Sequence, residues 1–450
     1  MTGPFDIVVV GAGPAGIAAA AAAAEAGQRV ALLDDNPAPG GQIWRRGGPM
    51  PAQARAWLAR LQASAAVRLQ GWRVIDLPGP HRVRAERSGR AAQAGDSAMQ
   101  GDCADFGYKR LILATGARER FLPFPGWTLP NVMGAGGLDA MVRGGLPIAG
   151  RRVVVAGTGP LLLAVAAHLR AHGARIVAVC EQASLPRLAR FAARLMREPS
   201  KLAQGARYRL ATMPARFRTG CWPVAAHGDD RLRRVTLRQG AREWDVDCDY
   251  LACGFHLVPN LELPALLGCR IADGFVATGD LMLTSFPDVY CAGEPTGIGG
   301  VDLSLLEGQI AGLAAAGREA EAQRLARKRR ARLGFVRALA QACALDARLR
   351  TLADERTIVC RCEDVRFAAL QPLAGWREAK VHTRCGMGPC QGRICRTATE
   401  FLFGWGADSA RPPVFPALVA SLAPLPDATA GVEADPAEAG TLLNDPKETA

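Results

Sequence analysis

Residues 5–35 read FDIVVVGAGPAGIAAAAAAAEAGQRVALLDD, and this stretch decides the fold of the first part of the chain. An apolar, β-branched run leads into the loop Gly11-x-Gly13-x-x-Gly16. An alanine-rich segment then leads to a second apolar run that ends at Asp34. A strand, a tight glycine turn, a helix and a second strand in this order form a βαβ unit that binds a dinucleotide. The sequence therefore predicts an α/β fold that begins with a Rossmann-like domain.

Each part of the loop has a physical role. The first glycine permits the tight turn, the second lets the backbone approach a pyrophosphate, and the third lets the helix pack closely on the strand. The N-terminal end of the helix attracts phosphate charge, and an acid at the end of the second strand is placed to bond an adenosine ribose. The expected residues of this first nucleotide site are Gly11, Gly13, Pro14, Ala15, Gly16 and Asp34.

A second unit of the same kind begins at residue 151 with RRVVVAGTGPLLLAVAAHLRAHGARIVAVCE. Gly157, Gly159 and the terminal Glu181 repeat the first pattern, but Leu162 stands where the third glycine is expected. Glu181 favours a ribose 2′-hydroxyl, so NAD is preferred to NADP if either binds. Two interpretations stay open: a working site for NAD or another adenine nucleotide, and a vestigial fold.

The composition is that of an ordinary globular protein. The 450 residues are 49% hydrophobic and 22% charged, and this length suits two or three domains with sizeable cores. The formal net charge of +13 comes mostly from arginines scattered through many segments. No recognition helix or basic patch with interleaved aromatic residues is visible, so we expect no nucleic-acid partner.

The first residues enter a strand almost at once, without a recognisable targeting segment, and no apolar run reaches the length of a membrane span. We therefore expect a cytoplasmic protein, in which clustered cysteines indicate metal or redox chemistry rather than structural disulfides. Residues 318–350 have helical periodicity and a basic face. A solvated linker helix is the simpler interpretation, and a partner surface or peripheral attachment to the inner face of a membrane is the alternative.

Three later segments decide which dinucleotide the first site takes. PGGQI at 39–43, LILATGAR at 111–118 and VYCAGEPTGIGG at 289–300 together resemble the two-dinucleotide flavoproteins that include thioredoxin reductase and the large subunit of sarcosine oxidase. The resemblance implies FAD. It also implies that the acid after Gly293, here Glu294 instead of the usual aspartate, reaches the ribityl chain. The other residues that it places beside FAD are Gly41, Gln42, Thr115 and Gly116.

Five of the thirteen cysteines lie between residues 360 and 395, in CRC at 360–362 and CGMGPCQGRIC at 385–395. Four cysteines complete the ligand set of a [2Fe–2S] cluster, and the interleaved glycines let backbone amides turn toward the sulfurs. Structural zinc is the rival, because the same spacings suit a tetrahedral site, and an emptied site is the third interpretation. A flavin domain needs an electron outlet, which favours the cluster.

The cysteine segment resembles a bacterioferritin-associated-ferredoxin-like module. The resemblance implies that Cys385 is a neighbour of the cluster and does not bind it. The expected metal ligands are Cys360, Cys362, Cys390 and Cys395.

The order of all these motifs resembles the larger flavoprotein subunit of opine oxidases, hydrogen cyanide synthase and heteromeric proline or D-hydroxyproline dehydrogenases. In such enzymes a separate amino-acid-oxidase-like subunit binds its own FAD and oxidises the amine. The resemblance implies that this chain passes electrons through FAD and a [2Fe–2S] cluster, often with a small ferredoxin-like third subunit. A stand-alone NADH-dependent reductase, which would use the second glycine unit, is the competing interpretation, and a redox-silent scaffold is the third.

No catalytic residue is expected on this chain. None of the six histidines lies in a recognisable acid–base or metal motif, and the reactive cysteine pair of disulfide reductases is missing. The cofactors carry the chemistry in such a relay. The expected organisation is a FAD domain in two parts (1–147 and 273–320), an inserted nucleotide domain (148–272), linker helices (321–355), a [2Fe–2S] domain (356–410) and an extended or disordered tail (411–450).

Overall fold

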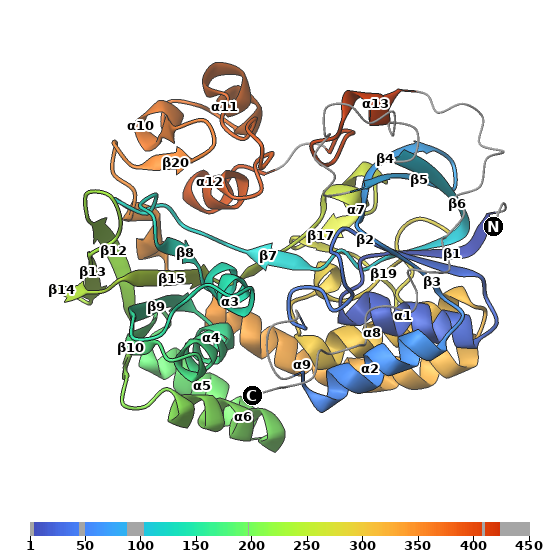
Figure 1. The fold of residues 1–450 in the computed structure, drawn as a ribbon, viewed down its shortest axis with the longest axis horizontal. Coiled ribbons are helices and arrows are strands. Elements are labelled where there is room, and N and C mark those ends of the chain that lie inside the picture. The colour runs from blue at the N-terminus through green and yellow to red at the C-terminus, as the bar shows by residue number, and fades with distance from the viewer. Residues whose placement is uncertain (1–3, 45–49, 88–102, 197, 407–409, 424–450) are drawn as a thin grey trace, which may run out of the picture.

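The computed structural model describes residues 4–44, 50–87, 103–196, 198–406 and 410–423. Two α/β halves lie side by side, and a small cysteine-rich unit lies above the second half (Figure 1). The halves are joined by β7 (Ala117–Glu119) and β16 (Leu257–Pro259), which pair antiparallel. The expected fold class, two Rossmann-like domains with a small C-terminal domain that carries the cysteines, is confirmed.

The first half is built on a seven-stranded sheet with the order β3-β2-β1-β6-β5-β4, and β19 also pairs with β6. β1 pairs in parallel with β2 and β6, whereas β4, β5 and the start of β6 are antiparallel. The central strands are buried on both faces, as their continuous apolar sequences require. The strands are β1 (Phe5–Val10), β2 (Val30–Asp34), β3 (Val67–Gln70), β4 (Trp72–Gly79), β5 (Arg82–Arg87), β6 (Cys103–Leu113) and β19 (Val289–Cys291).

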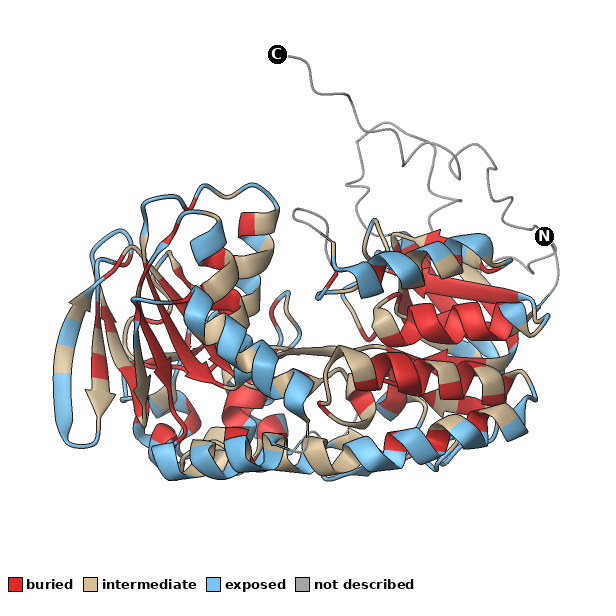
Figure 2. Cartoon of the chain, turned by 90° about the horizontal axis from the view of Figure 1, so that it is seen from below, coloured by how far each residue is buried: buried red, intermediate tan, exposed pale blue. Residues whose placement is uncertain are grey.

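Two closely packed helices, α1 (Pro14–Glu25) and α8 (Val301–Ala315), cover one face of this sheet and are largely buried (Figure 2). A Cβ atom on Gly308 would lie 2.1 Å from the backbone oxygen of Ala15, and one on Gly312 would lie 2.4 Å from that of Ala19. Only small residues allow such a close approach. The alanine-rich sequence of α1 is therefore explained by its packing, with α2 (Ala52–Ala63) on its outer side.

The second half has a parallel five-stranded sheet with the order β11-β10-β9-β15-β8, and a three-stranded antiparallel sheet, β12-β13-β14. Its strands are β8 (Val132–Gly134), β9 (Arg152–Thr158), β10 (Arg175–Glu181), β11 (Arg216–Thr219), β12 (Cys221–His227), β13 (Arg234–Gln239), β14 (Arg242–Asp247) and β15 (Tyr250–Phe255). Its helices are α3 (Ala135–Arg143), α4 (Pro160–Ala171), α5 (Leu185–Leu195) and α6 (Pro199–Ala211).

The chain returns to the first half through short elements and then forms the long helix α9, which runs along both halves (Figure 2). The cysteine-rich unit follows, with a core that includes Trp376 and several of the cysteines. These elements are α7 (Glu262–Leu266), β17 (Ile271–Ala272), β18 (Phe275–Val276), η2 (Glu294–Thr296), α9 (Glu319–Cys343), η3 (Ala347–Thr351), β20 (Ile358–Cys360), β21 (Val365–Arg366), α10 (Phe367–Leu370), α11 (Trp376–Thr383) and α12 (Cys395–Phe403).

The start of the expected tail packs on the first half and ends in α13 (Val419–Leu422). The Val414 N–H donates to the Ile75 oxygen at 2.8 Å, and the Leu418 N–H donates to the Glu86 carboxylate at 3.1 Å. Residues 424–450 lie outside the described part of the chain. No helix among the described residues is both long and apolar enough to cross a bilayer.

Candidate cofactor sites

The first glycine loop is open where a pyrophosphate would lie. Gly11 has φ +103°, and a Cβ atom there would lie 2.3 Å from the Ala114 oxygen. A Cβ atom on Gly16 would lie 1.7 Å from the Gly11 oxygen, so neither position accepts a side chain. At Gly13, by contrast, no heavy atom of the described residues lies within 4 Å of the Cβ position, its chain neighbours aside. The backbone at the N-terminus of α1 is therefore accessible to a phosphate group, as a dinucleotide site requires.

Asp34 lies at the end of β2, next to the glycine loop, where an acid is expected to contact the ribose of a bound dinucleotide. Its carboxylate accepts hydrogen bonds from the Ala12 N–H at 2.5 Å and from the Asn36 N–H at 2.8 Å. Burial raises the pKa of Asp34, although these hydrogen bonds act in the opposite direction. The carboxylate thus ties the glycine loop to β2 and lies at the position expected of a ribose-binding acid.

The other residues expected beside FAD gather around this loop. A Cβ atom on Gly41 would lie 2.9 Å from the Cα of Gly13, so the segment containing Gln42 lies directly beside the glycine loop. Asn260, which the sequence patterns did not single out, holds the strand end after β6 in place. It bonds Thr115 through its backbone oxygen (2.9 Å) and its amide nitrogen (2.8 Å), and its N–H donates to the Gly116 oxygen at 3.0 Å.

A buried acid that the sequence motifs did not reveal positions the segment around Glu294. The Glu307 carboxylate accepts hydrogen bonds from the Gly293 N–H (3.0 Å), the Thr296 hydroxyl (2.8 Å) and the Arg329 guanidinium (2.7 Å). Glu307 is 1% exposed, and Arg329 comes from α9. An acid inside the apolar run LSLLEGQIAG was the available signal, because a charged group is rarely buried without a partner.

The carboxyl group of Glu294 should make stability depend on pH. Burial raises its pKa from 4.5 to about 7. A raised carboxyl pKa means that the folded state holds the proton more tightly than the unfolded chain, so stability is lost as pH rises from about 4.5 through about 7. In FAD-free protein, we expect Glu294→Gln to raise the melting temperature by roughly 2 °C at pH 8 and to change it little at pH 4.5. Equal effects at both pH values in thermal unfolding would contradict this expectation.

The second glycine loop differs, because the protein itself covers it. A Cβ atom on Gly159 would lie 3.2 Å from the sulfur of Cys343, at the end of α9. The Glu181 carboxylate is 4% exposed and already accepts hydrogen bonds from the Gly159 N–H (2.7 Å), the Thr158 hydroxyl (2.6 Å) and the Ala183 N–H (2.9 Å). Glu181 thus ties its loop to β10 as Asp34 ties the first loop to β2, and the difference between the two sites is the approach of Cys343 to Gly159.

Residues 343–346, which we call the closing segment, are held over this loop by specific bonds. The Gln182 side chain donates to the Ala344 oxygen at 3.1 Å and accepts from the Asp346 N–H at 3.1 Å. Arg187 donates to the same Ala344 oxygen at 2.7 Å. Leu162, the residue in place of the third glycine, is 1% exposed and packs in the core of the second half.

Three cysteines form a buried group in the C-terminal unit. The sulfur atoms of Cys360, Cys385 and Cys395 all lie within 4.8 Å of one another. The Gly386 N–H donates to the Cys360 sulfur at 3.4 Å, as expected for glycines that turn amides toward sulfur. The Cys385 and Cys395 thiols and this amide lower the pKa of Cys360 to about 2. Such a set suits a metal that prefers thiolates.

The remaining two cysteines form a second, more exposed group beside the first. Burial raises the pKa of the Cys362 thiol, and the neighbouring Cys390 also acts on it. Cys362 is exposed and Cys390 is half-buried. A Cβ atom on Gly388 would lie 2.4 Å from the Cβ of Cys362, so this glycine allows the two segments to meet. The four expected ligands are thus divided between the two groups, and Cys385, left out of the expected set, lies in the buried one.

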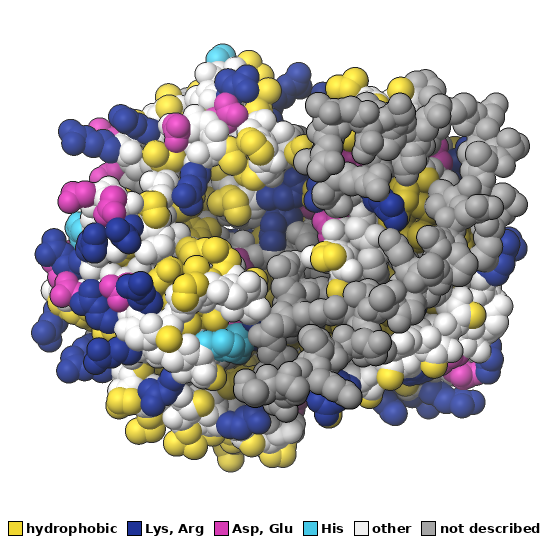
Figure 3. All heavy atoms as spheres, viewed as in Figure 1, with side chains coloured by type: hydrophobic (Ala, Val, Ile, Leu, Met, Phe, Trp, Pro, Cys, Tyr) yellow, Lys and Arg dark blue, Asp and Glu magenta, His cyan; other side chains and the backbone are white. Residues whose placement is uncertain are grey.

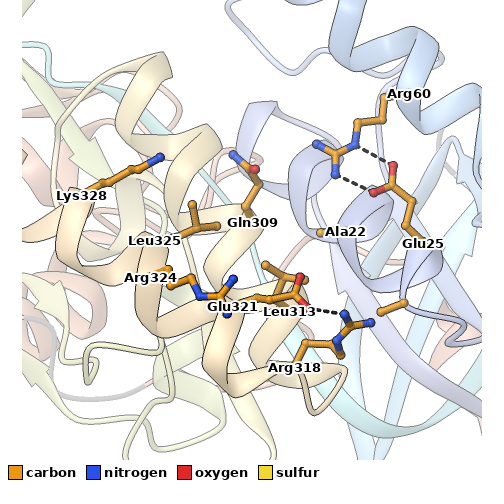
Figure 4. A pocket seen from close by; sticks show the side chains of 11 residues that line it. Ala22, Glu25, Arg60, Gln309, Leu313, Arg318, Glu321, Arg324, Leu325 and Lys328 are labelled. Atoms are coloured by element: carbon orange, nitrogen blue, oxygen red, sulfur yellow. Dashed lines mark hydrogen bonds and ion pairs between the residues drawn. The ribbon is translucent and has the colours of Figure 1, made fainter.

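One cavity of the described chain lies away from both glycine loops and from the cysteines. It has a volume of about 540 Å³ and lies between α1, α2, α8 and α9 (Figure 4). Two ion pairs on its wall, Arg60 with Glu25 and Arg318 with Glu321, point across it. It contains no residue of either glycine loop and no cysteine, so we assign it no part in the chemistry.

Residues 5–320 match the pyridine nucleotide-disulphide oxidoreductase family. The chain belongs to this family. It is 34% identical to one subunit of the opine oxidase of Rhizobium meliloti (strain 1021), over 87% of this chain and 90% of that protein. It is 32% identical to hydrogen cyanide synthase subunit HcnB of Pseudomonas protegens, over 86% and 89%. The expected resemblance to opine oxidase and hydrogen cyanide synthase subunits is therefore confirmed.

The fold is also similar to solved structures of this class. The L-proline dehydrogenase from P. horikoshii superposes with a TM-score of 0.63 over 94% of this chain and 80% of that chain, at 17% identity. At this identity the match supports the fold alone. Together with the open first loop, membership of the family makes this protein a flavin oxidoreductase that binds FAD.

Proposed function

We propose that the chain is the electron-transferring subunit of a multi-subunit dehydrogenase that acts on the CH–NH group of an amino acid or opine, such as octopine, nopaline, proline or D-hydroxyproline. The amine would be oxidised on an amino-acid-oxidase-like subunit with its own FAD, and a small ferredoxin-like subunit would complete the complex. The relatives support this assembly, because they are themselves named as subunits of opine oxidase and hydrogen cyanide synthase.

The observation that carries the proposal is the contrast between the two glycine loops. The Cβ position of Gly13 is open, whereas that of Gly159 lies 3.2 Å from the sulfur of Cys343 in the closing segment. A relay that receives electrons from another subunit needs one flavin and an outlet, but it has no need of a nicotinamide site. FAD carries electrons in pairs, and a [2Fe–2S] cluster would pass them on singly.

We propose that the cysteine-rich unit holds this cluster. Cys362 and Cys390 would bind one iron, and Cys360 and Cys395 the other, in line with the two groups that the sulfurs form. Cys395 is preferred to Cys385 for a physical reason. It begins α12, at the positive end of the helix dipole, which stabilises a thiolate, whereas Cys385 follows the C-terminal end of α11.

The domain limits given by the sequence remain a proposal. Two elements of the second half, β8 and α3, precede residue 148, whereas α7, within 148–272, packs in the core of the first half. The elements of the cysteine-rich unit lie within 356–410. A cytoplasmic complex, in which thiols stay reduced for cluster assembly, is part of the proposal.

The helix α9 serves as a linker that packs against both halves, through Arg329 on one side and Phe335 on the other.

NADH should not reduce the flavin of the isolated chain. Because Cys343 lies against Gly159, where a phosphate would approach the backbone, we expect no bleaching of the flavin absorbance within minutes of adding NADH anaerobically. Dithionite should bleach the flavin, and this control shows that the bound flavin can be reduced when a suitable electron donor is present. Bleaching by an amine should require the partner subunit.

Two outcomes would decide against the proposal. Rapid bleaching by NADH would establish the stand-alone reductase that uses Gly157, Gly159 and Glu181. A flavin that stays oxidised in the assembled complex during amine turnover would establish a structural role.

A further inference from the structure

Arg118 lies at the junction between the flavin domain and the cysteine-rich unit. It is on β7, two residues after Gly116, and its guanidinium donates to the Asn260 side chain at 2.6 Å. Asn260 in turn is bonded to Thr115 and Gly116, the strand end expected to border the flavin. Arg118 is therefore connected to the proposed flavin site by two successive hydrogen bonds.

The same guanidinium reaches the cysteine-rich unit. Its Nε donates to the backbone oxygen of Arg393 at 3.1 Å, across 275 residues of sequence. The Arg393 N–H donates to the Cys390 oxygen at 3.0 Å, so the bonded path ends within the cysteine segment. Arg393 also stacks over Phe415, 3.9 Å from the ring centre to the guanidinium carbon, which fixes it against the first half.

The junction also contains a partly buried ion pair and several basic side chains. Arg118 pairs with Glu262 at 2.9 Å, and both side chains are only 17% exposed. Burial lowers the pKa of Arg118, while the charges on Glu262 and Cys390 act in the opposite direction. Lys and Arg side chains gather in the hollow between α12 and β7 (Figure 3). Four thiolates and two ferric ions with two sulfides carry a net negative charge, and this charge grows when one ferric ion becomes ferrous.

We infer that Arg118 is a positioning residue for electron transfer, which docks the cysteine-rich unit on the flavin domain and favours the reduced cluster through its positive charge. This inference rests on the proposed function. Each electron that leaves the reduced flavin is taken up by a ferric ion, and a nearby partly buried cation stabilises the added negative charge. Glu262 opposes this effect, so the two members of the ion pair should act in opposite directions.

The test is a redox titration of the purified chain, followed by the EPR signal of the reduced cluster. We expect Arg118→Met to lower the midpoint potential and Glu262→Gln to raise it. Each shift should change the ratio of reduced to oxidised cluster roughly tenfold at a fixed potential, which is about 59 mV for one electron. Arg118→Lys retains the charge but loses the forked hydrogen bonds, so its potential should stay close to that of the unchanged protein while flavin-to-cluster transfer slows.

A matched control is Arg84→Met, which also removes a buried arginine from an ion pair, here with Asp105 at 2.7 Å, on the antiparallel part of the first sheet. It should leave the potential unchanged. Shifts of the same sign in Arg118→Met and Glu262→Gln, or no shift in either, would overturn the inference. A lack of any cluster signal in the unchanged, chemically reduced protein would instead refute the proposed cluster itself.

Discussion

Purified Gly13→Val protein is expected to lose most of its bound FAD and its yellow colour while it remains folded. Within the described part of the chain, no other residue lies within 4 Å of the Gly13 Cβ position, and its φ of −74° is accessible to valine, so the apoprotein has no reason to unfold. The added side chain would occupy the space in which a pyrophosphate contacts the backbone. Overpacking of this kind costs about 1–3 kcal/mol, which is roughly a 10- to 100-fold loss of affinity.

Flavin content per chain, measured by absorbance after desalting, checks this prediction. Gly137→Val is a matched control, because Gly137 also has open space at its Cβ position but lies on α3, in the second half. It should keep its flavin. Circular dichroism should show equal helix content in both variants. Full flavin occupancy in folded Gly13→Val would mean that FAD binds elsewhere in the chain.

The first nucleotide site could be predicted from sequence because its determinants are local. Gly11, Gly13, Gly16 and Asp34 lie within one βαβ unit, where each residue type has a strict steric or electrostatic role. The structure places them as those roles require, with two glycines in closed positions and one in an open position. Local patterns of this kind are visible without knowledge of the rest of the fold.

The second site shows where local reasoning ends. Gly157, Gly159 and Glu181 repeat the pattern, yet the closing segment that covers them comes from more than 150 residues later in the chain. Nothing in the sequence of 343–346 indicates this contact. A glycine loop predicts backbone geometry, but whether its concave side is free depends on what tertiary packing brings to it.

The junction around Arg118 was missed for the same reason. Arginines are numerous in this chain, so no local pattern distinguishes Arg118 from the others. Its contacts with Asn260 and Arg393 join three segments that are far apart in sequence. The structural role of Glu307 was easier to infer from the sequence, because a charged residue inside an apolar helix requires a buried partner, here Arg329. The identity of that partner still required the fold.

The cysteine-rich unit should lose its cluster when any one of four thiols is replaced. The unchanged protein, purified anaerobically, should contain about two irons and two labile sulfides per chain. Serine at Cys360, Cys362, Cys390 or Cys395 should remove or strongly perturb the cluster, because a hard alkoxide is a poorer iron ligand than a soft thiolate. The flavin should remain bound in each variant, since the first glycine loop lies in another domain.

Cys385→Ser is the variant that discriminates between ligand sets. Cys385 is fully buried and lies within 4.8 Å of Cys360 and Cys395, so proximity alone would admit it as a ligand. The helix ends favour Cys395, because it is the first residue of α12, at the positive end of the helix dipole, whereas Cys385 follows the negative C-terminal end of α11. We therefore expect Cys385→Ser to keep its iron and Cys395→Ser to lose it. Cys103→Ser, on β6 of the first half, is the control and should keep both cofactors.

The reverse result would exchange the two ligands without removing the relay. Loss of iron in Cys385→Ser, with retention in Cys395→Ser, would leave the cluster in nearly the same place, because the two sulfurs lie within 4.8 Å of each other. Zinc without iron in the anaerobically purified protein would have a larger consequence. Zinc has no accessible second oxidation state, so the outlet for flavin electrons would have to lie on a partner, and the junction at Arg118 would serve only to dock a structural unit.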